Sequence, residues 1–169
     1  DLGIFSNVIG ENIRDVDAWG GAVTRAGGDA GSFRSTIESL NEKMIDAKIK
    51  RFNEIIPFFN QLGISIIDTN GRVKKTLNIL PELVDAFSRI GKQKSLGIGK
   101  KLGLDAGTIA LLQKGRGEVN KLIKRQKKLG LANKEAAKLS KEVVDIMADF
   151  KQVSRSIATG ILVERLPAI

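Results

Sequence analysis

The chain has 169 residues, of which 42% are hydrophobic and 28% are charged, and its formal net charge is +9. This length and this composition are typical of a globular domain with a hydrophobic core. Cys, His and Tyr are absent, which excludes disulfides, thiolate nucleophiles, Cys/His metal sites and imidazole acid–base catalysis.

The excess positive charge is concentrated in one window. Between Lys92 and Lys128 there are 11 Lys/Arg and 2 Asp/Glu, so the rest of the chain is balanced. Such asymmetry is typical of a surface that binds phosphate, anionic lipid or an acidic partner, and a solvated helix face without a partner is an equal alternative. The chain begins at Asp1 without an initiator Met or a signal-peptide pattern, so we expect it to be a piece of a longer protein.

The first 31 residues predict a loosely helical lead-in. Apolar residues recur with a helical rhythm up to Val23, but Gly10 and the pair Gly20-Gly21 interrupt it. The glycine-rich stretch AGGDAGS then breaks the pattern. We therefore expect broken or mobile helices over residues 1–31, followed by a helical domain over residues 32–169.

The helical domain begins with a long amphipathic helix. Phe33, Ile37 and Leu40 start an apolar stripe with three- and four-residue steps, and Ser32 is its expected N-cap. We expect Pro57 to kink or end this helix, because proline removes a backbone donor and crowds the preceding turn.

A small β-hairpin is predicted over residues 64–75. β-branched residues flank Asn70-Gly71, the strongest short hairpin signal, because a type I′ turn needs positive φ at two positions. A calcium loop is excluded here, since Ile66 and Leu77 would occupy its first and last positions, where carboxylates are needed. The expected fold is therefore all-α, a mainly helical, multi-helix domain with this one hairpin.

Helices resume after the hairpin. The first is expected from Leu77 to Ile90, with Asn78 as its cap and Pro81 in its first turn, where proline is tolerated. Short helices separated by glycines are expected next, over residues 95–102, 106–114 and 117–129.

The longest helix is predicted from about residue 134 to about residue 159, with Asn133 as its cap. Its apolar stripe is wide and close to a heptad pattern. This stripe either packs against the rest of the domain or packs against a partner helix, and the sequence leaves both interpretations open. The stripe consists of Ala136, Leu139, Val143, Ile146, Met147, Phe150, Val153, Ile157 and Ile161.

Residues 95–114 have the core spacing of a helix-turn-helix motif. With Gly103 in the turn, Gly99 is the small residue that lets the second helix pack closely, and the core positions are Ile98, Leu102, Leu104, Ile109 and Leu112. The second helix is a poor DNA reader, because base edges are read by Arg, Lys, Asn and Gln near the helix start. We expect its outward face to carry Asp105, Ala106, Gly107, Ala110, Leu111, Gln113 and Lys114.

The basic helix over residues 117–128 is better suited to non-specific contact with phosphates. No aromatic residue lies between Lys92 and Lys128 to stack on bases. A DNA-binding regulator that uses residues 95–114 with this basic helix is therefore the alternative function. The candidate phosphate- or partner-binding face consists of Lys114, Arg116, Lys121, Lys124, Arg125 and Lys128.

The sequence contains no recognisable catalytic, cofactor or metal motif. Carboxylate pairs such as Glu142/Asp145 lie at helical spacing beside lysines, as surface ion pairs do. The glycines between Gly97 and Gly103 lack a preceding strand and the Walker spacing. We therefore predict a non-enzymatic protein with no cofactor, no metal and no small-molecule substrate.

Several longer phrases resemble phage tail tape-measure proteins. PFFNQLGIS, the DTNGR turn and NILPEL follow one another as in a segment of that family, and LGLDAGTIALLQKG is similar to the segment that comes next. DAWGGAVTRAGGDAGSFRSTIESL fits the lead-in. The resemblance extends from about Asp15 to about Lys128, and it departs from the family in the unusually basic run from Lys121 to Lys128.

The resemblance implies a structural protein of the virion tail, encoded by a phage or prophage. Tape-measure proteins set the length of the tail tube and assist genome delivery. The implied partners are other copies of the chain, the tail tube protein and tail assembly chaperones. The implied locations are the lumen of the tail tube and, during assembly, the host cytoplasm.

The resemblance and the charge pattern leave further partners open. In a tail, the basic face would meet DNA, anionic lipid headgroups or acidic residues lining the tube. A third class of function, an envelope-active pore or toxin fragment, is suggested only by the glycine-rich amphipathic N-terminal region.

Overall fold

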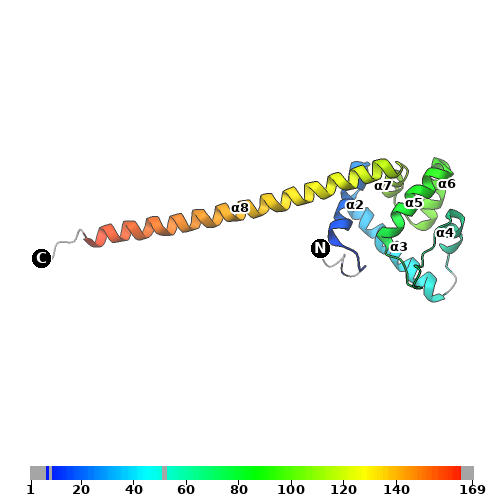
Figure 1. The fold of residues 1–169 in the computed structure, drawn as a ribbon, viewed down its shortest axis with the longest axis horizontal. Helices are drawn as coiled ribbons and strands as arrows, with labels where there is room; N and C mark the ends of the chain where they lie inside the picture. The colour runs from blue at the N-terminus through cyan, green and yellow to red at the C-terminus, as the bar shows by residue number, and fades with distance from the viewer. Residues whose placement is uncertain (1–6, 8, 51–52, 165–169) are drawn as a thin grey trace. The chain divides into compact units, whose positions relative to one another are not determined.

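The computed structural model describes residue 7, residues 9–50 and residues 53–164. The fold is all-α, as predicted, and the chain divides into two units, residues 1–128 and residues 129–169. The boundary between the two units follows Lys128, whereas the sequence analysis predicted a boundary after residue 31. Seven helices lie in the described part of the chain (Figure 1): α2 (Ile13–Arg25), α3 (Ala30–Lys50), α4 (Ile56–Leu62), α5 (Thr76–Ile90), α6 (Lys92–Leu102), α7 (Ala106–Leu112) and α8 (Arg116–Glu164).

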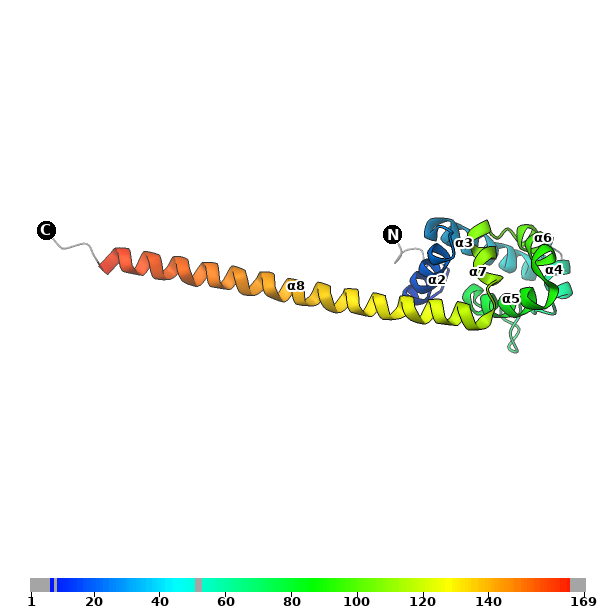
Figure 2. The same cartoon turned by 90° about the horizontal axis from the view of Figure 1, so that it is seen from above.

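Helix α2 is regular, and its expected break at Gly20-Gly21 is not seen. The Asn12 side chain caps it by accepting a hydrogen bond from the Arg14 N–H at 2.9 Å. Its apolar face packs against α3 and α7 (Figures 1 and 2). A Cβ on Gly20 would lie 3.4 Å from the Cβ of Ala30, which is an ordinary contact distance, so α2 and α3 pack closely at this point.

Helix α3 begins before Ser32, which is therefore not its N-cap. The Asp29 carboxylate accepts hydrogen bonds from the Ser32 N–H at 2.7 Å and from the Ser32 hydroxyl at 3.1 Å. Asp29 thus accepts a hydrogen bond from a free backbone N–H in the first turn of α3, as an N-cap residue does. Pro57 lies in the first turn of α4. Proline is tolerated there because the backbone N–H that it lacks would have no partner within the helix.

The predicted β-hairpin over residues 64–75 is not formed. The described residues contain no strand, and this segment has only one isolated antiparallel bridge, between Ile67 and Val73. The Ile64 and Ile66 side chains are buried in the helical core. Because that arm of the segment packs into the core, it does not continue as a paired strand.

The chain reverses through a turn organised by Asp68. Its carboxylate accepts hydrogen bonds from the N–H groups of Asn70 and Arg72, each at 2.8 Å. The Asp68 N–H also donates to the Arg72 carbonyl at 2.8 Å, so the loop has three residues instead of two. Gly71 ends this loop with φ of +72°, which matches a type I turn followed by a left-handed glycine.

Helix α5 begins at Thr76, one residue before the expected Leu77, and Asn78 is not its cap, because the capping group comes from elsewhere in the chain. The Glu11 carboxylate accepts a hydrogen bond from the Leu77 N–H at 2.9 Å. The Thr76 hydroxyl donates to the Asn41 side chain at 3.2 Å. Pro81 consequently lies inside the helix and not in its first turn.

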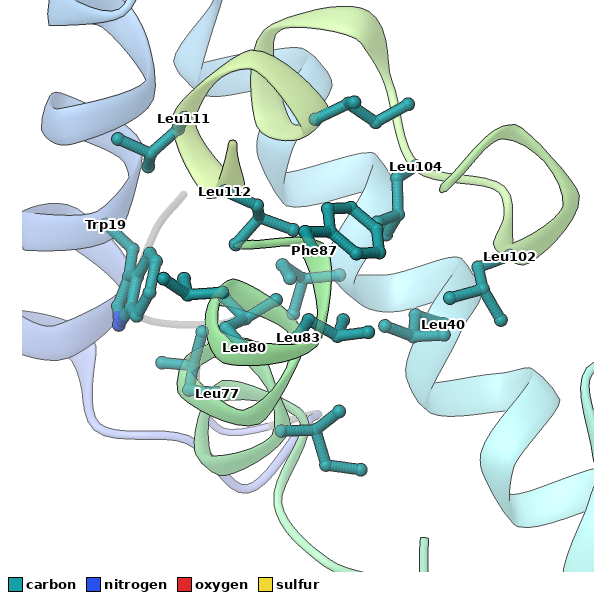
Figure 3. Close-up of a cluster of buried hydrophobic side chains, with 14 of the residues drawn as sticks. Trp19, Leu40, Leu77, Leu80, Leu83, Phe87, Leu102, Leu104, Leu111 and Leu112 are labelled. Carbon is teal, nitrogen blue, oxygen red and sulfur yellow. The ribbon is translucent and has the colours of Figure 1, made fainter. Parts of the chain in front are cut away.

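Helix α5 also supplies the centre of the hydrophobic core. It contacts α3, α6 and α7, and its buried leucines and Phe87 meet side chains from each of them. Figure 3 shows this cluster, whose labelled members are Trp19, Leu40, Leu77, Leu80, Leu83, Phe87, Leu102, Leu104, Leu111 and Leu112.

Helix α8 is continuous from Arg116 to Glu164, and the expected break before residue 134 is absent. A glycine inside a helix costs about 1 kcal/mol, and Gly130 alone does not end this one. The members of the apolar stripe whose side chains are described, Ala136 to Met147, are exposed, with 62% of Leu139 and 67% of Ile146 accessible. These side chains are therefore not buried by their own unit. No described helix is long and apolar enough to cross a membrane.

Candidate interaction surface

Helices α6 and α7 form the packing arrangement of a helix-turn-helix. Gly103 has φ of +84° and ends α6 by donating to the carbonyls of Gly99 and Lys100. A Cβ on Gly99 would lie 2.8 Å from the Ile109 side chain, so any larger residue at that position would require the Ile109 side chain to move. The predicted core positions are all buried: Ile98, Leu102, Leu104, Ile109 and Leu112.

The first turn of α7 is held by other parts of the same unit. Asp105 caps α7, accepting hydrogen bonds from the N–H groups of Gly107 at 2.9 Å and Thr108 at 3.1 Å. The other Asp105 oxygen accepts from the Thr36 hydroxyl of α3 at 2.9 Å and from the Thr108 hydroxyl. This carboxylate therefore joins α7 to α3.

The loop between α2 and α3 lies directly against the same turn. A Cβ on Gly107 would lie 2.4 Å from the Gly28 Cα, and a Cβ on Gly28 would lie 2.7 Å from the Gly107 Cα. A recognition helix needs its N-terminal turn open to enter the major groove. In this fold that turn is covered.

Leu111 does not belong to an exposed face of α7, contrary to the expectation. It is fully buried, and Thr108 is almost fully buried, because α7 packs against α2 as well as against α5 and α6. The remaining predicted outward residues are half-buried except Ala106 and Lys114, which are exposed. The second helix thus presents little to a DNA groove.

Two of the six predicted basic residues have partners within the unit. The Arg116 Nε donates to the Asp85 carboxylate at 2.7 Å, and its Nη2 donates to the other Asp85 oxygen and to the Pro81 carbonyl at 3.0 Å. The Lys121 ammonium lies 3.7 Å from the Glu118 carboxylate. These contacts neutralise part of the predicted face.

The Arg116–Asp85 pair shifts the pKa values of both side chains. The hydrogen bonds from Arg116 hold the pKa of the Asp85 carboxyl below its usual value. The same hydrogen bonds raise the pKa of the Arg116 guanidinium. Arg116 therefore connects the start of α8 to α5 and is unsuited to binding an external phosphate.

Lys124, Arg125 and Lys128 form the remaining part of the predicted face on α8. All three are exposed, and their side chains make no ion pair in the described part of the chain. Their three- and four-residue spacing places them on one side of the helix, opposite the buried Val119. We call these three residues the α8 basic face. Lys127 lies off it and pairs with Asp15 at 2.6 Å.

Helix α6 carries a second group of lysines that the predicted face did not include. Lys92, Lys94, Lys100 and Lys101 are exposed and have no ion-pair partner among the described residues. The signal was available in the sequence, since no acidic residue occurs between Asp85 and Asp105. The prediction began the face at Lys114, which is also exposed.

The described residues give little support for a ligand-binding cleft or a metal site. A hollow of about 490 Å³ is lined partly by Glu82, Asp85, Arg89 and Arg116, but Asp85 and Arg116 bind each other, and Arg89 donates to the Leu62 carbonyl. The described residues contain no group of three acidic side chains that could hold a metal ion.

Comparisons of the chain with protein-family models, with curated proteins and with solved structures found no match.

Proposed function

We propose that this chain is a structural, non-enzymatic module of a phage tail tape-measure protein. In this role it contributes to the length and assembly of the tail tube and to genome delivery. Its partners would be further copies of the chain, the tail tube protein and tail assembly chaperones.

The observation that carries the proposal is where the family-like phrases lie in the fold. PFFNQLGIS forms α4 and the left-handed Gly63 that ends it, and LGLDAGTIALLQKG forms the end of α6, the Gly103 turn and α7. Their distinctive residues are buried or cap helices, as Phe59 and Asp105 are. Phrases that encode packing are expected in a structural module, whereas an enzyme signature would include exposed polar groups around a cleft.

The length of α8 supports the same proposal. Its 49 residues correspond to about 70 Å of helix at 1.5 Å per residue. A long helix spans a distance fixed by its number of residues, which is what a length-determining protein requires. The α8 basic face would then contact phosphate groups or acidic residues lining the tube.

The alternative, a sequence-specific DNA-binding regulator, has less support. Its reading helix would be α7, whose first turn is covered by the Gly28 loop and tied to Thr36 through Asp105. The accessible lysines on α6 and α8 suit contact with the phosphate backbone, which carries no sequence information. We therefore expect any duplex binding to be weak and independent of sequence.

A deletion within α8 of the encoding phage or prophage tests the tape-measure role. Removing residues 129–149 deletes 21 residues and preserves the heptad phase, so the tail should shorten by about 30 Å at 1.5 Å per residue. Electron microscopy of purified tails measures this change. The matched control replaces the same 21 residues with an unrelated helical sequence of equal length, which should keep the tail length.

Two outcomes would contradict the proposal. The first is a deletion mutant that assembles tails of unchanged length. The second is a genome in which the reading frame containing this chain is short and does not lie among tail genes.

A further inference from the structure

The distal part of α8 exposes several neighbouring apolar side chains to water. Leu139, Val143, Ile146 and Met147 are between 55% and 69% accessible. Single exposed apolar residues are ordinary, but a contiguous apolar face marks an interaction surface. This face is therefore a surface suited to packing against another helix.

The spacing of the apolar residues identifies a coiled-coil seam. From Leu129 onward they alternate three- and four-residue steps, which is the pattern of heptad positions a and d. Position a is occupied by Leu129, Ala136, Val143, Phe150 and Ile157, and position d by Ala132, Leu139, Ile146 and Val153. Four consecutive heptads exceed what a chance pattern provides and are enough for a coiled coil.

The charges on this segment argue against a lipid or nucleic-acid partner. Between residues 129 and 157 there are five basic and four acidic residues, so the segment has a net charge of only +1. Membrane-surface helices and phosphate-binding helices carry an excess of Lys and Arg on the polar side. The polar side here instead pairs its own charges, as Lys138 does with Glu142 at 3.8 Å.

The residues beside the seam also select an orientation. Glu135, Glu142 and Asp149 occupy position g, while Asn133, Ser140 and Met147 occupy position e. In an antiparallel pair of identical helices, position g faces position g, so carboxylates would face carboxylates. In a parallel pair, position g faces position e, so each acid meets a neutral residue.

We infer that residues 129–157 form a parallel, in-register coiled coil with the same segment of another copy of this chain. The inference deepens the proposed function, since it names the surface through which further copies of the chain would associate. Its own evidence is the heptad seam, which is complementary to itself in any protein that contains it. The copies associate through Val143, Ile146 and their heptad equivalents, and the unit of residues 1–128 is not required for association.

Two single substitutions in the full chain test the seam. Ile146→Glu places a charge at position d, and Val144→Glu places the same charge at position b, off the seam; the wild-type side chains are 67% and 62% accessible. Sedimentation equilibrium should show two or more copies for the wild type and for Val144→Glu. Ile146→Glu should be monomeric at the same concentration, with unchanged Trp19 fluorescence because residues 1–128 stay folded.

A wild-type chain that stays monomeric at about 100 µM, more than tenfold above ordinary micromolar dissociation constants, would overturn the inference. Equal effects of Ile146→Glu and Val144→Glu would overturn it as well. So would a monomeric wild type whose α8 binds phosphatidylglycerol vesicles, since the apolar face would then serve a lipid surface.

A single cysteine tests the orientation, because the chain contains no native Cys. Ala132→Cys lies near one end of the seam at position d, so a parallel in-register pair brings the two thiols together. Oxidised glutathione should then give a covalent dimer on a non-reducing gel. An oligomer that forms no disulfide through Cys at this position would contradict the parallel arrangement.

Discussion

Replacing Gly107 by alanine tests whether the loop after α2 closes over the first turn of α7. The new Cβ would lie 2.4 Å from the Gly28 Cα and 3.1 Å from an Asp105 carboxylate oxygen. Carbon atoms in contact are normally about 3.5–4.0 Å apart, so one of the two backbones must move by about 1 Å. No side-chain rotation can relieve this clash, because the closest atom belongs to the backbone.

The net effect on stability is the difference between two opposing terms. Alanine in a helix is favoured over glycine by about 1 kcal/mol. Overpacking costs about 1–3 kcal/mol, and a displaced first turn also weakens the Asp105 cap, worth about 1 kcal/mol. We therefore expect Gly107→Ala to lower the free energy of unfolding by about 1–3 kcal/mol, or about 2–4 °C in Tm per kcal/mol.

Urea denaturation followed by Trp19 fluorescence measures this change. Trp19 is the only tryptophan, is 6% accessible and lies on α2, which contacts α7. The matched control is Gly117→Ala in α8, where a Cβ meets nothing within 4 Å, so stability should stay the same or rise. If Gly107→Ala is as stable as this control, Gly107 and Gly28 are not in contact and the argument that α7 is covered fails.

Four further changes probe the capping, titrating and basic groups of residues 1–128. Asp105→Ala should lower the free energy of unfolding by about 1–2 kcal/mol in urea melts because α7 loses its cap, and Asp105→Asn, which keeps a capping oxygen, should lose less. Burial raises the pKa of the Glu11 carboxyl, so its contribution to stability is present below the unfolded-state pKa and is lost as the pH rises through the folded-state pKa. Glu11→Gln, which keeps the acceptor for the Leu77 N–H, should therefore be more stable than wild type at pH 7 and lose that advantage near pH 3.5, below the ordinary Glu pKa of about 4.3; equal stability at both pH values would contradict the burial argument. Arg116→Gln should raise the pKa of Asp85 in an NMR titration, because the Arg116 guanidinium holds that pKa low in the wild type. A carboxyl whose pKa is lowered by folding stabilises the protein above its unfolded-state pKa, and this stability is lost as the pH falls through the folded-state pKa. The variant should therefore be less stable than the wild type at neutral pH, and the difference in the free energy of unfolding should shrink in acid. If the chain binds duplex DNA, Lys128→Gln should reduce the slope of log K against log salt by about 1, whereas Lys127→Gln, whose ammonium pairs with Asp15, should leave that slope unchanged.

The all-α fold and the α6–α7 packing were predictable because their signals are local. Helical periodicity is a property of neighbouring residues, and the spacing of Gly99, Gly103 and Ile109 fixes one tight helix crossing within 11 residues of chain. The same spacing correctly predicted which residues of α6 and α7 enter the core, with the exception of Leu111. That exception arises because α7 has a second neighbour, α2, which no local pattern reveals.

Tertiary contacts decided where helices begin and whether the hairpin formed. Helix α5 starts at Thr76 because Glu11, which is 66 residues earlier, accepts the Leu77 N–H. The signal at Asn70-Gly71 correctly indicated a turn, but burial of Ile64 and Ile66 in a helical core limited the pairing of the two arms to the single bridge between Ile67 and Val73. A two-stranded ribbon is marginal in water, so packing overrides it readily.

The sequence by itself determined the total charge, its concentration between Lys92 and Lys128, and the heptad spacing of α8. Only the tertiary structure decided which of those charges are available, because pairing depends on residues far apart in the chain. Arg116 meets Asp85 and Lys127 meets Asp15, whereas Lys124, Arg125 and Lys128 point away from the core and meet none. Periodicity and composition are local properties of a sequence, and burial and ion pairing are set by which elements the fold brings together.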